Sequence, residues 1–253
     1  MGRVASRVKV GGILLIALLP GLGVPALSRA ADVPDPAAKG AIEEIIRDYI
    51  KAHPEVIEES LQKLEERRQA EAKQRGREAV VANRLELLHD PESPIHGNPS
   101  GDVTVVEFFD YRCRYCKAMA GSVTQLLKDD PKVRLVYKDF PILGEASVVA
   151  SKAALASRAQ EKYPAFHEAL MAAKGDLTQA AVVEIAASVG LDTVKLQADM
   201  EAPAIMGVIE KNRALGKTLG LTGTPAFVVG QELAPGAMDL AEMKELVAQA
   251  RAK

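Results

Sequence analysis

The spacing of hydrophobic and polar positions divides the chain into a helical N-terminal part and a mixed C-terminal part. Between residues 42 and 64, isoleucine, leucine and tyrosine recur every three or four positions among charged residues, which predicts amphipathic helices. The pair His53-Pro54 interrupts this pattern, because proline disfavours a helical conformation in the residue before it. His53 is therefore interpreted as a helix-boundary residue. Residues 65–78 are mostly charged or alanine and predict a solvated continuation of the helix.

The C-terminal part, residues 103–253, reads as strands separated by helices. A buried strand is predicted at 103–109, a helix at 116–128 and a second strand at 133–137. A helical insertion of about residues 143–219 follows. Its predicted helices cover residues 145–158, 161–173, 179–189 and 193–219, and the elements after it cover residues 226–229, 232–234 and 239–253. Strands before the insertion must pair with strands after it, so the expected fold class is α/β with a helical insertion.

A linker is predicted between the two parts. Residues 89–102 contain three prolines and two glycines, a composition typical of turns and loops. The N-terminal helical part is accordingly assigned to residues 31–88, and it ends in an apolar patch at residues 79–88.

The first thirty residues have the organisation of a secretory signal peptide, with a basic start, a short apolar core and the motif Ser28-Arg29-Ala30. A membrane anchor is the alternative, but prolines and glycines interrupt the core, which is shorter than the roughly 20 residues of a membrane span. We therefore expect cleavage near Ala30 and a periplasmic location. Loss of the basic leader takes the formal charge from −2 to about −6. This acidic balance argues against a nucleic-acid partner.

The only two cysteines, Cys113 and Cys116, fall where a predicted strand ends and a helix begins. Backbone N–H groups and the positive end of the helix dipole stabilise a thiolate there, and Arg114 adds a positive charge. We interpret Cys113 as the attacking sulfur and Cys116 as the resolving one, so that their redox-active disulfide serves in place of a cofactor. A structural disulfide and a metal half-site are alternatives. A closed zinc site needs about four ligands, however, and no metal site is assigned.

A second motif, TPAFVVG at residues 224–230, places a proline at the start of a strand after the insertion. With VVEFFDYRCRYC and the insertion in this order, the sequence from about residue 102 to 253 resembles the DsbA-like branch of the thioredoxin superfamily. This resemblance implies a thioredoxin-like fold with a cis bond between Thr224 and Pro225 beside the cysteines. The backbone of Thr224 would then pair with a bound peptide. A trans proline at the start of an edge strand is the alternative.

The resemblance also assigns roles to residues around the cysteines. Glu107 matches the family's buried acid, which relays protons to and from the resolving sulfur, and burial should raise its pKa. Lys138 is expected to be the charge partner of Glu107, with a solvated lysine at the strand end as the alternative. The strong oxidases of the family have histidine where this sequence has Tyr115, so we expect weaker oxidant behaviour.

The N-terminal part narrows the resemblance. A leader, the helix IEEIIRDYI, the break HPEVIEESLQ and a charged helix ahead of a DsbA-like domain are similar to the suppressor for copper sensitivity protein C (ScsC) group. This similarity implies self-association through residues 42–64, with a trimer favoured. It also implies a disulfide isomerase that acts on envelope proteins, depends on a membrane redox partner and has a role in copper tolerance.

Alternatives remain for both the N-terminal helices and the function. The amphipathic helices could fold back on their own domain instead of joining several copies. The same cysteine pair could serve a monomeric dithiol oxidase, or a copper-binding or chaperone-like adaptor.

Overall fold

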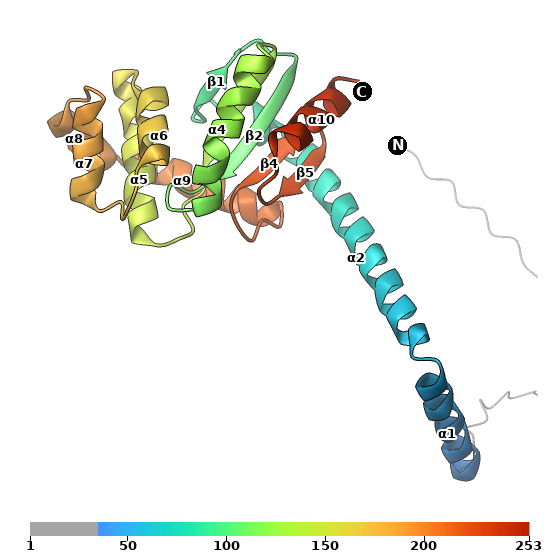
Figure 1. Cartoon of the computed structure of the whole chain (residues 1–253). Coiled ribbons are helices and arrows are strands. Elements are labelled where there is room, and N and C mark those ends of the chain that lie inside the picture. Colours follow the sequence, from blue (N-terminus) through green and yellow to red (C-terminus); the bar gives the residue numbers. More distant parts are fainter. Residues whose placement is uncertain (1–34, 253) are drawn as a thin grey trace, which may run out of the picture. The chain divides into compact units, whose positions relative to one another are not determined.

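The computed structural model describes residues 35–252, which form two units that divide between Glu59 and Ser60. Helix α1 (Pro36–Ala52) lies in the first unit (Figure 1). Its N-terminus is capped by Asp35, whose carboxylate accepts a hydrogen bond from the backbone N–H of Ala37 at 3.4 Å. The helix ends at His53, as the His53-Pro54 pair predicts.

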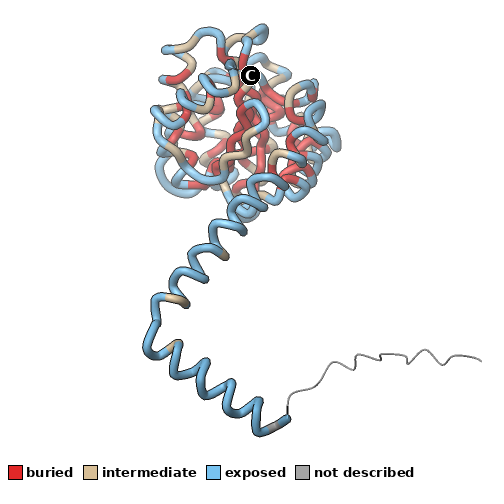
Figure 2. Tube along the Cα trace, turned by 90° about the vertical axis from the view of Figure 1, so that its right-hand side faces the viewer, coloured by how far each residue is buried: buried red, intermediate tan, exposed pale blue. Residues whose placement is uncertain are grey.

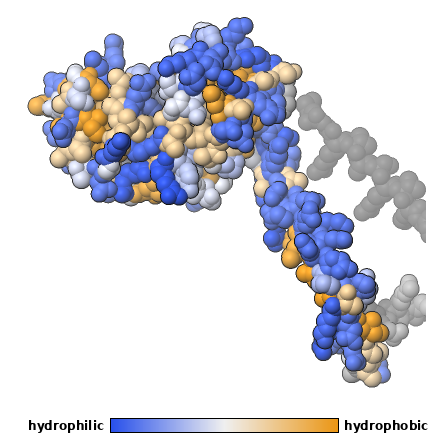
Figure 3. Space-filling model, viewed as in Figure 1, coloured by the Kyte–Doolittle hydropathy of each residue, from blue (hydrophilic) through white to orange (hydrophobic). Residues whose placement is uncertain are grey.

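Helix α1 presents an apolar stripe that is exposed within the first unit. Almost all of this helix is exposed (Figure 2). Hydrophobic residues are visible on it among hydrophilic ones in Figure 3. Four of the large apolar side chains are 50% to 68% exposed, and they are Ile42, Ile45, Ile46 and Tyr49. Ile50, on the same helix, is partly buried. Their spacing of three and four residues places them on one face, as expected for a helix that is amphipathic.

The C-terminal turns of helix α2 (Glu55–Ala82) and the short helix α3 (Arg84–Leu88) belong to the core of the second unit. Val80 on α2 and Leu87 on α3 are buried there, and the guanidinium of Arg77 forms an ion pair with Glu232. The structure thus differs from the expected division at residue 88. Most positions of α2 are charged or polar, so the sequence pattern does not indicate which few of its residues are buried.

The second unit is built on a five-stranded sheet in the order β1-β3-β2-β4-β5. At its centre, β2 is parallel to β3 and antiparallel to β4, so strands from the two sides of the insertion pair directly, as expected. The strands are β1 (Ile95–Gly97), β2 (Val103–Phe109), β3 (Val133–Asp139), β4 (Ala226–Val229) and β5 (Glu232–Pro235). β1 lies in the segment expected to be a linker, because three residues between prolines and glycines are too few to show a strand pattern.

Helices cover both faces of this sheet (Figure 1). α4 and α10 share a core with one face, and α9 shares another core with the opposite face and the end of α2. The helices are α4 (Arg114–Asp129), α5 (Glu145–Ala156), α6 (Tyr163–Ala172), α7 (Gln179–Ser188), α8 (Thr193–Met200), α9 (Pro203–Thr218) and α10 (Leu240–Arg251). Residues 193–219, expected as one helix, form two, because Pro203 starts a new helix.

Strand alternation determines where Lys138 lies. In the parallel pair of β2 and β3, Glu107 is opposite Tyr137 and Phe108 is opposite Lys138. Successive side chains of a strand point to opposite faces of the sheet. Lys138 is therefore on the other face from Glu107, and the expected pairing of these two residues is wrong.

Lys138 instead anchors the segment that leads into the domain. Its Nζ donates to the carbonyl of Glu86 at 2.7 Å and forms an ion pair of 3.1 Å with Asp90, and the side chains of this pair are both 0% exposed. Asp90 also pairs with Lys211 at 3.1 Å. Burial lowers the pKa of Lys138, and the charge of Asp90 opposes this effect. The alternative of a solvated lysine at the strand end is therefore also wrong.

The expected signal peptide, residues 1–30, lies outside the described residues. No helix between residues 35 and 252 combines the length and the apolar character needed to cross a bilayer. The 28-residue helix α2 has the length, but charged side chains interrupt it throughout.

Lys138→Met should lower the free energy of unfolding by about 3 kcal/mol, because it removes one cation from a carboxylate that stays buried. Urea unfolding followed by circular dichroism measures this loss. Lys132→Met, at an exposed position just before the same strand, is the matched control and should change stability by less than about 0.5 kcal/mol. Equal stability of the two variants would contradict the anchoring role.

Candidate functional site

The two cysteines lie at the start of α4, directly after the turn that follows β2. Cys113 is the N-cap residue of the helix, and Cys116 lies in its first turn. The backbone N–H of Cys113 donates to the carbonyl of Asp110 at 3.0 Å, which closes the turn between strand and helix. Both cysteines are free thiols, and Cys113 is 6% exposed while Cys116 is 0% exposed. Cys113 is thus the more accessible of the two cysteines, although it is mostly buried.

The Thr-Pro motif lies against Cys113. The peptide bond between Thr224 and Pro225 is cis, and the thiol of Cys113 donates to the carbonyl of Thr224 at 3.1 Å. The carbonyl of Pro225 accepts a hydrogen bond from the backbone N–H of Gly236 at 2.9 Å, which ties the loop to the end of β5. The predicted cis bond and its place beside Cys113 are therefore confirmed.

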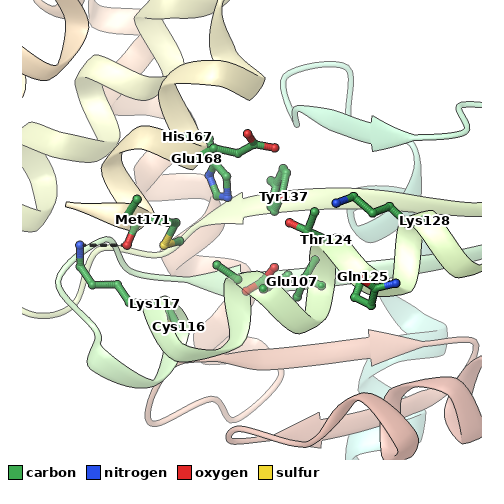
Figure 4. Close-up of a pocket in the computed structure, with 14 residues that line it drawn as sticks. Glu107, Cys116, Lys117, Thr124, Gln125, Lys128, Tyr137, His167, Glu168 and Met171 are labelled. Carbon is green, nitrogen blue, oxygen red and sulfur yellow. Dashed lines mark hydrogen bonds between the residues drawn. The ribbon is translucent and has the colours of Figure 1, made fainter. Parts of the chain in front are cut away.

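Glu107 lines a cavity of about 460 Å³ together with Cys116, Tyr137 and His167. Figure 4 shows that the side chains around this cavity come from α4 on one side and α6 on the other, with β2 and β3 between them. Glu107 is only 3% exposed, and burial raises the pKa of its carboxyl to about 8. No cation among the described residues offsets this effect. The carboxyl therefore holds its proton near neutral pH, as expected for a buried acid.

Cys116 is a thiol that resists ionisation. Burial raises its pKa well above the ordinary value for cysteine, and the neighbouring charges of Cys113 and Glu107 raise it further, while a backbone hydrogen bond with Asp110 opposes them. Cys116 must lose its proton before it can attack a disulfide. A carboxylate at Glu107 and a thiolate at Cys116 are like charges in one desolvated region, so ionisation of either group disfavours ionisation of the other.

Comparison with protein families agrees with this geometry. Residues 104–248, more than half of the chain, match the family model of the DSBA-like thioredoxin domain. The chain belongs to the DsbA-like thioredoxin family, a family of thiol–disulfide oxidoreductases. Residues 39–71 match the ScsC N-terminal domain of copper resistance proteins, so both parts of the expected resemblance are confirmed.

Solved structures of DsbA-like proteins superimpose on this chain. A thioredoxin-like oxidoreductase of Silicibacter pomeroyi is 50% identical with a TM-score of 0.67, and the match covers 68% of this chain and 99% of the other. A linker-deletion mutant of ScsC from Proteus mirabilis is 26% identical with a TM-score of 0.67, covering 87% and 98%. A periplasmic thioredoxin-like protein of Salmonella enterica serovar Typhimurium is 30% identical with a TM-score of 0.63, covering 67% and 96%.

Antiporters are also among the curated relatives. The chain is 28% identical over 143 residues, or 55% of its length, to the Na+/H+ antiporter NhaA 3 of Salinispora tropica. It spans about a quarter of the length of these antiporters, between 22% and 26%.

The two residues between the cysteines of this DsbA-like site interact with each other. The guanidinium of Arg114 donates to the hydroxyl of Tyr115 at 2.7 Å and lies 4.7 Å from the centre of its ring. Tyr115 is 51% exposed, so the pair forms part of the surface beside the cysteines. The guanidinium of Arg114 is thus held against the ring of Tyr115 by a cation–π contact. The backbone N–H groups at the start of α4 also contribute positive potential at Cys113.

Lys117 and His167 join the DsbA-like site to the helical insertion, and neither was expected from the sequence. The Nζ of Lys117 donates to the carbonyls of Leu170 at 2.9 Å and Ala173 at 2.7 Å, which caps the C-terminus of α6. Nδ1 of His167 lies 3.0 Å from the hydroxyl of Tyr111, and burial lowers the pKa of His167 to about 3. This histidine is therefore a neutral hydrogen-bonding group in the core.

Asp110 is the third residue that was not expected, and it holds the turn before the cysteines. It is fully buried, and its carboxylate accepts four hydrogen bonds. The sequence shows Asp110 within the motif FFDYRC, but three of its four hydrogen-bond partners are more than thirty positions further along the chain. No local signal in the sequence could have shown them. Among residues 35–252, no group of three or more histidine, cysteine, aspartate or glutamate side chains is arranged to hold a metal ion.

Glu107→Gln should raise the free energy of unfolding of the reduced protein at pH 8 by up to about 4 kcal/mol. The folded state holds a proton on Glu107 up to about pH 8, whereas the unfolded carboxyl releases it near pH 4.5. The wild-type protein therefore loses stability as pH rises between these values, and the variant does not. Urea unfolding at pH 4, 6 and 8 measures this difference.

The matched control is Glu245→Gln, at an exposed position on α10, which should leave the pH dependence as it is in the wild type. At pH 4 the E107Q variant and the wild type should be nearly equally stable, because Glu107 is protonated in both states of the wild type. A parallel pH dependence of wild type and E107Q would show that Glu107 is not the titrating group.

Proposed function

We propose that this protein is an exported thiol–disulfide oxidoreductase that works as an oligomeric protein disulfide isomerase. The observation that carries the proposal is the contact of 3.1 Å between the Cys113 thiol and the carbonyl of Thr224. It places the accessible sulfur at a helix N-terminus, beside backbone groups that can pair with an extended peptide. Membership of the DsbA-like family supports the same chemistry.

In the proposed mechanism, the Cys113 thiolate attacks one sulfur of a substrate disulfide. The substrate's S–S bond breaks, its other sulfur leaves as a thiolate, and a mixed disulfide forms between Cys113 and the substrate. The backbone of Thr224 and Pro225 would hold the substrate chain beside this bond. The backbone N–H groups at the start of α4 favour Cys113 as both nucleophile and leaving group.

The mixed disulfide has two outcomes in this proposal. If another thiolate of the substrate attacks the substrate's own sulfur, Cys113 leaves as a thiolate and the substrate has a new disulfide with no net redox change. If Cys116 attacks Cys113 instead, the substrate departs as a thiolate and a disulfide forms between Cys113 and Cys116. The two cysteines have then passed two electrons to the substrate. The second outcome requires a proton acceptor for Cys116. Glu107, which lines the same cavity, would serve in the fraction of molecules in which its carboxyl has lost its proton.

A return to the dithiol form then requires a reductant. We assign this step to a membrane redox partner, because an isomerase starts each cycle from a reduced Cys113. No other cofactor enters the proposal, since the cysteine pair itself carries the electrons.

The exposed stripe of α1 supports self-association. Its four apolar side chains are at least half exposed in a single chain, and burial of such a stripe against copies of itself is favourable. The match of residues 39–71 to the ScsC N-terminal domain supports the same arrangement, for which a trimer remains our preferred number of subunits. In an oligomer, a substrate held by one domain stays close to the cysteines of the others.

Export and a periplasmic location are supported by the pattern of residues 1–30 and by the periplasmic relative from Salmonella enterica. Disulfides persist in that compartment, so proteins with wrongly paired cysteines are available there as substrates. The name of the N-terminal domain family, copper resistance protein, supports a role in copper tolerance.

Cys113→Ser should abolish the recovery of activity by scrambled ribonuclease, because no thiolate remains to open a substrate disulfide. Cys116→Ser should keep part of this activity and should accumulate mixed disulfides, which mass spectrometry detects. A wild-type protein that oxidises reduced ribonuclease but does not rescue the scrambled form would instead support the oxidase. A wild-type protein with neither activity would support the adaptor.

Ile42→Glu with Ile46→Glu should convert the oligomer to a monomer and remove most of the isomerase activity. Two charges placed in a buried stripe cost several kcal/mol per subunit. Light scattering measures the mass. The rate of insulin reduction should be unaffected, because a single domain performs this reaction. Arg47→Gln is the matched control, because it changes the charge in the same direction on the opposite side of α1.

An unchanged mass of the double variant would place the interface elsewhere. The interface can also be tested by deletion of the N-terminal helices. The deleted segment should end before residue 76, because Val80 and Leu87 belong to the core of the domain.

A further inference from the structure

Two contacts tie helix α6 of the insertion to the chain on either side of the cysteine pair. Before the pair, the hydroxyl of Tyr111 lies 3.0 Å from Nδ1 of His167 on α6. After the pair, the ammonium of Lys117 donates to the carbonyls of Leu170 at 2.9 Å and Ala173 at 2.7 Å, at the C-terminal end of α6. Figure 4 shows Lys117 reaching from α4 to α6. Both cysteines lie in the short segment between these two α6 contacts.

The space between α4 and α6 is only partly filled. The cavity of about 460 Å³ lies there, and the small residues Ala120 and Gly121 of α4 and Ala172 of α6 belong to its lining. A Cβ atom on Gly121 would meet no atom within 4 Å. Close packing of side chains holds most helices together, and it is incomplete between these two. The two α6 contacts are therefore important for fixing the cysteine end of α4 to the insertion.

The contact between Tyr111 and His167 is neutral. Burial lowers the pKa of His167 to about 3 and raises the pKa of Tyr111 well above its ordinary value. Near neutral pH the imidazole is therefore uncharged and the phenol keeps its proton. Tyr111 is two residues before Cys113, and this contact acts on the cysteines through the position of the backbone and not through charge.

Closure of the cysteine pair changes the segment between the two α6 contacts. In this structure both cysteines are thiols that lie in contact with each other. Formation of a covalent bond draws the two sulfurs together, and the residues that carry them must follow. Tyr111 and Lys117 are held to α6 on either side, so this movement works against both contacts.

We propose that Tyr111, His167 and Lys117 are positioning residues that favour the dithiol form of the cysteine pair, so that the helical insertion sets how readily the pair closes to a disulfide. A contact that closure weakens must disfavour closure by the same free energy. The inference rests on the proposed thiol exchange at Cys113. It gives the insertion a part in that function, because an isomerase starts each cycle from a reduced Cys113.

The test measures the equilibrium between the reduced protein and oxidised glutathione. In this exchange a bond forms between the sulfurs of Cys113 and Cys116, and the S–S bond of glutathione breaks. The two halves leave as thiols with the protons of the cysteines. A hydrogen bond that is equally strong in both forms of the protein stabilises both equally, so its removal leaves the equilibrium constant unchanged. The constant therefore separates a positioning role from a purely structural one.

Tyr111→Phe should raise the equilibrium constant for disulfide formation about fivefold, an effect typical of one neutral hydrogen bond. This change corresponds to a reduction potential that is lower by about 20 mV. Ser157→Ala is the matched control. It removes another buried hydroxyl, which donates to the carbonyl of Ala154 at 2.6 Å within the insertion. The control should lose stability and keep the wild-type constant.

His167 is tested with two substitutions of similar size. His167→Leu removes the polar atom and should raise the constant as far as Tyr111→Phe does. The two substitutions together should raise it no further, because they remove the same contact. His167→Asn places a polar atom near the position of Nδ1 and should keep the constant close to the wild-type value.

Lys117→Met removes the second contact and should also raise the constant. Because this substitution takes away a positive charge near the cysteines, the measurement is repeated at high salt, which screens the effect of charge. The increase should persist there if it comes from the hydrogen bonds to α6.

The outcomes separate this inference from the proposed function. If the wild type forms no disulfide with glutathione, the proposed function fails. If it does, but Tyr111→Phe and His167→Leu keep the wild-type constant, the positioning role is overturned while thiol exchange stands. Equal effects of His167→Leu and His167→Asn would overturn it as well, since the contact with Tyr111 would not be the cause. An increase in Lys117→Met that disappears at high salt would overturn the role of Lys117 alone.

Discussion

The pairing of β2 with β4 is the constraint on which the site depends. β2 ends just before the turn to Cys113, and β4 begins directly after Pro225. The two strands are antiparallel with Phe108 opposite Ala226, so the end of one strand and the start of the other lie at the same edge of the sheet. Cys113 and Thr224 therefore come within 3.1 Å although 111 positions separate them. The insertion can carry its own helices because the sheet, and not the insertion, brings these residues together.

Desolvation then sets the chemistry of the residues at this edge. Glu107 and Cys116 share one cavity, and burial raises the pKa of both groups. No cation within residues 35–252 lowers either pKa, because Lys138 lies on the other face of the sheet and pairs with Asp90. An unpaired buried acid destabilises the fold whenever it ionises, so Glu107 opposes folding at alkaline pH. In the proposed function, the ionised form of Glu107 would be a base of suitable strength for the Cys116 thiol, which would give a functional reason for the destabilisation.

Features that depend on local spacing could be predicted from the sequence, and contacts between distant segments could not. The strand at 103–109, the cysteines at its junction with a helix and the Thr-Pro motif each occupy a few consecutive residues, and the structure confirms them. The supposed pairing of Glu107 with Lys138 depended on strand register, in which a shift of one residue moves a side chain to the other face. The carboxylate of Asp110 binds backbone N–H groups, which every residue except proline has, so its partners have no signature in the sequence. In each case the missing information is which segments meet in space.

The proposed isomerase activity depends on how α2 connects the two parts of the chain. α2 begins in the first unit and ends in the core of the second, where Val80 is buried. Lys138 and Asp90 fix the segment that follows, so the start of the domain cannot separate from the sheet without the exposure of a buried ion pair. Isomerisation requires that a substrate with a broken disulfide stays near a thiol until the correct pair forms. A firm attachment at the base of α2 would keep every DsbA-like domain of an oligomer within reach of that substrate, whereas the exchange at Cys113 needs one domain only. In the proposed isomerase, the cysteines would carry out the thiol exchange, and the N-terminal helices would determine how long the substrate remains available for a further exchange.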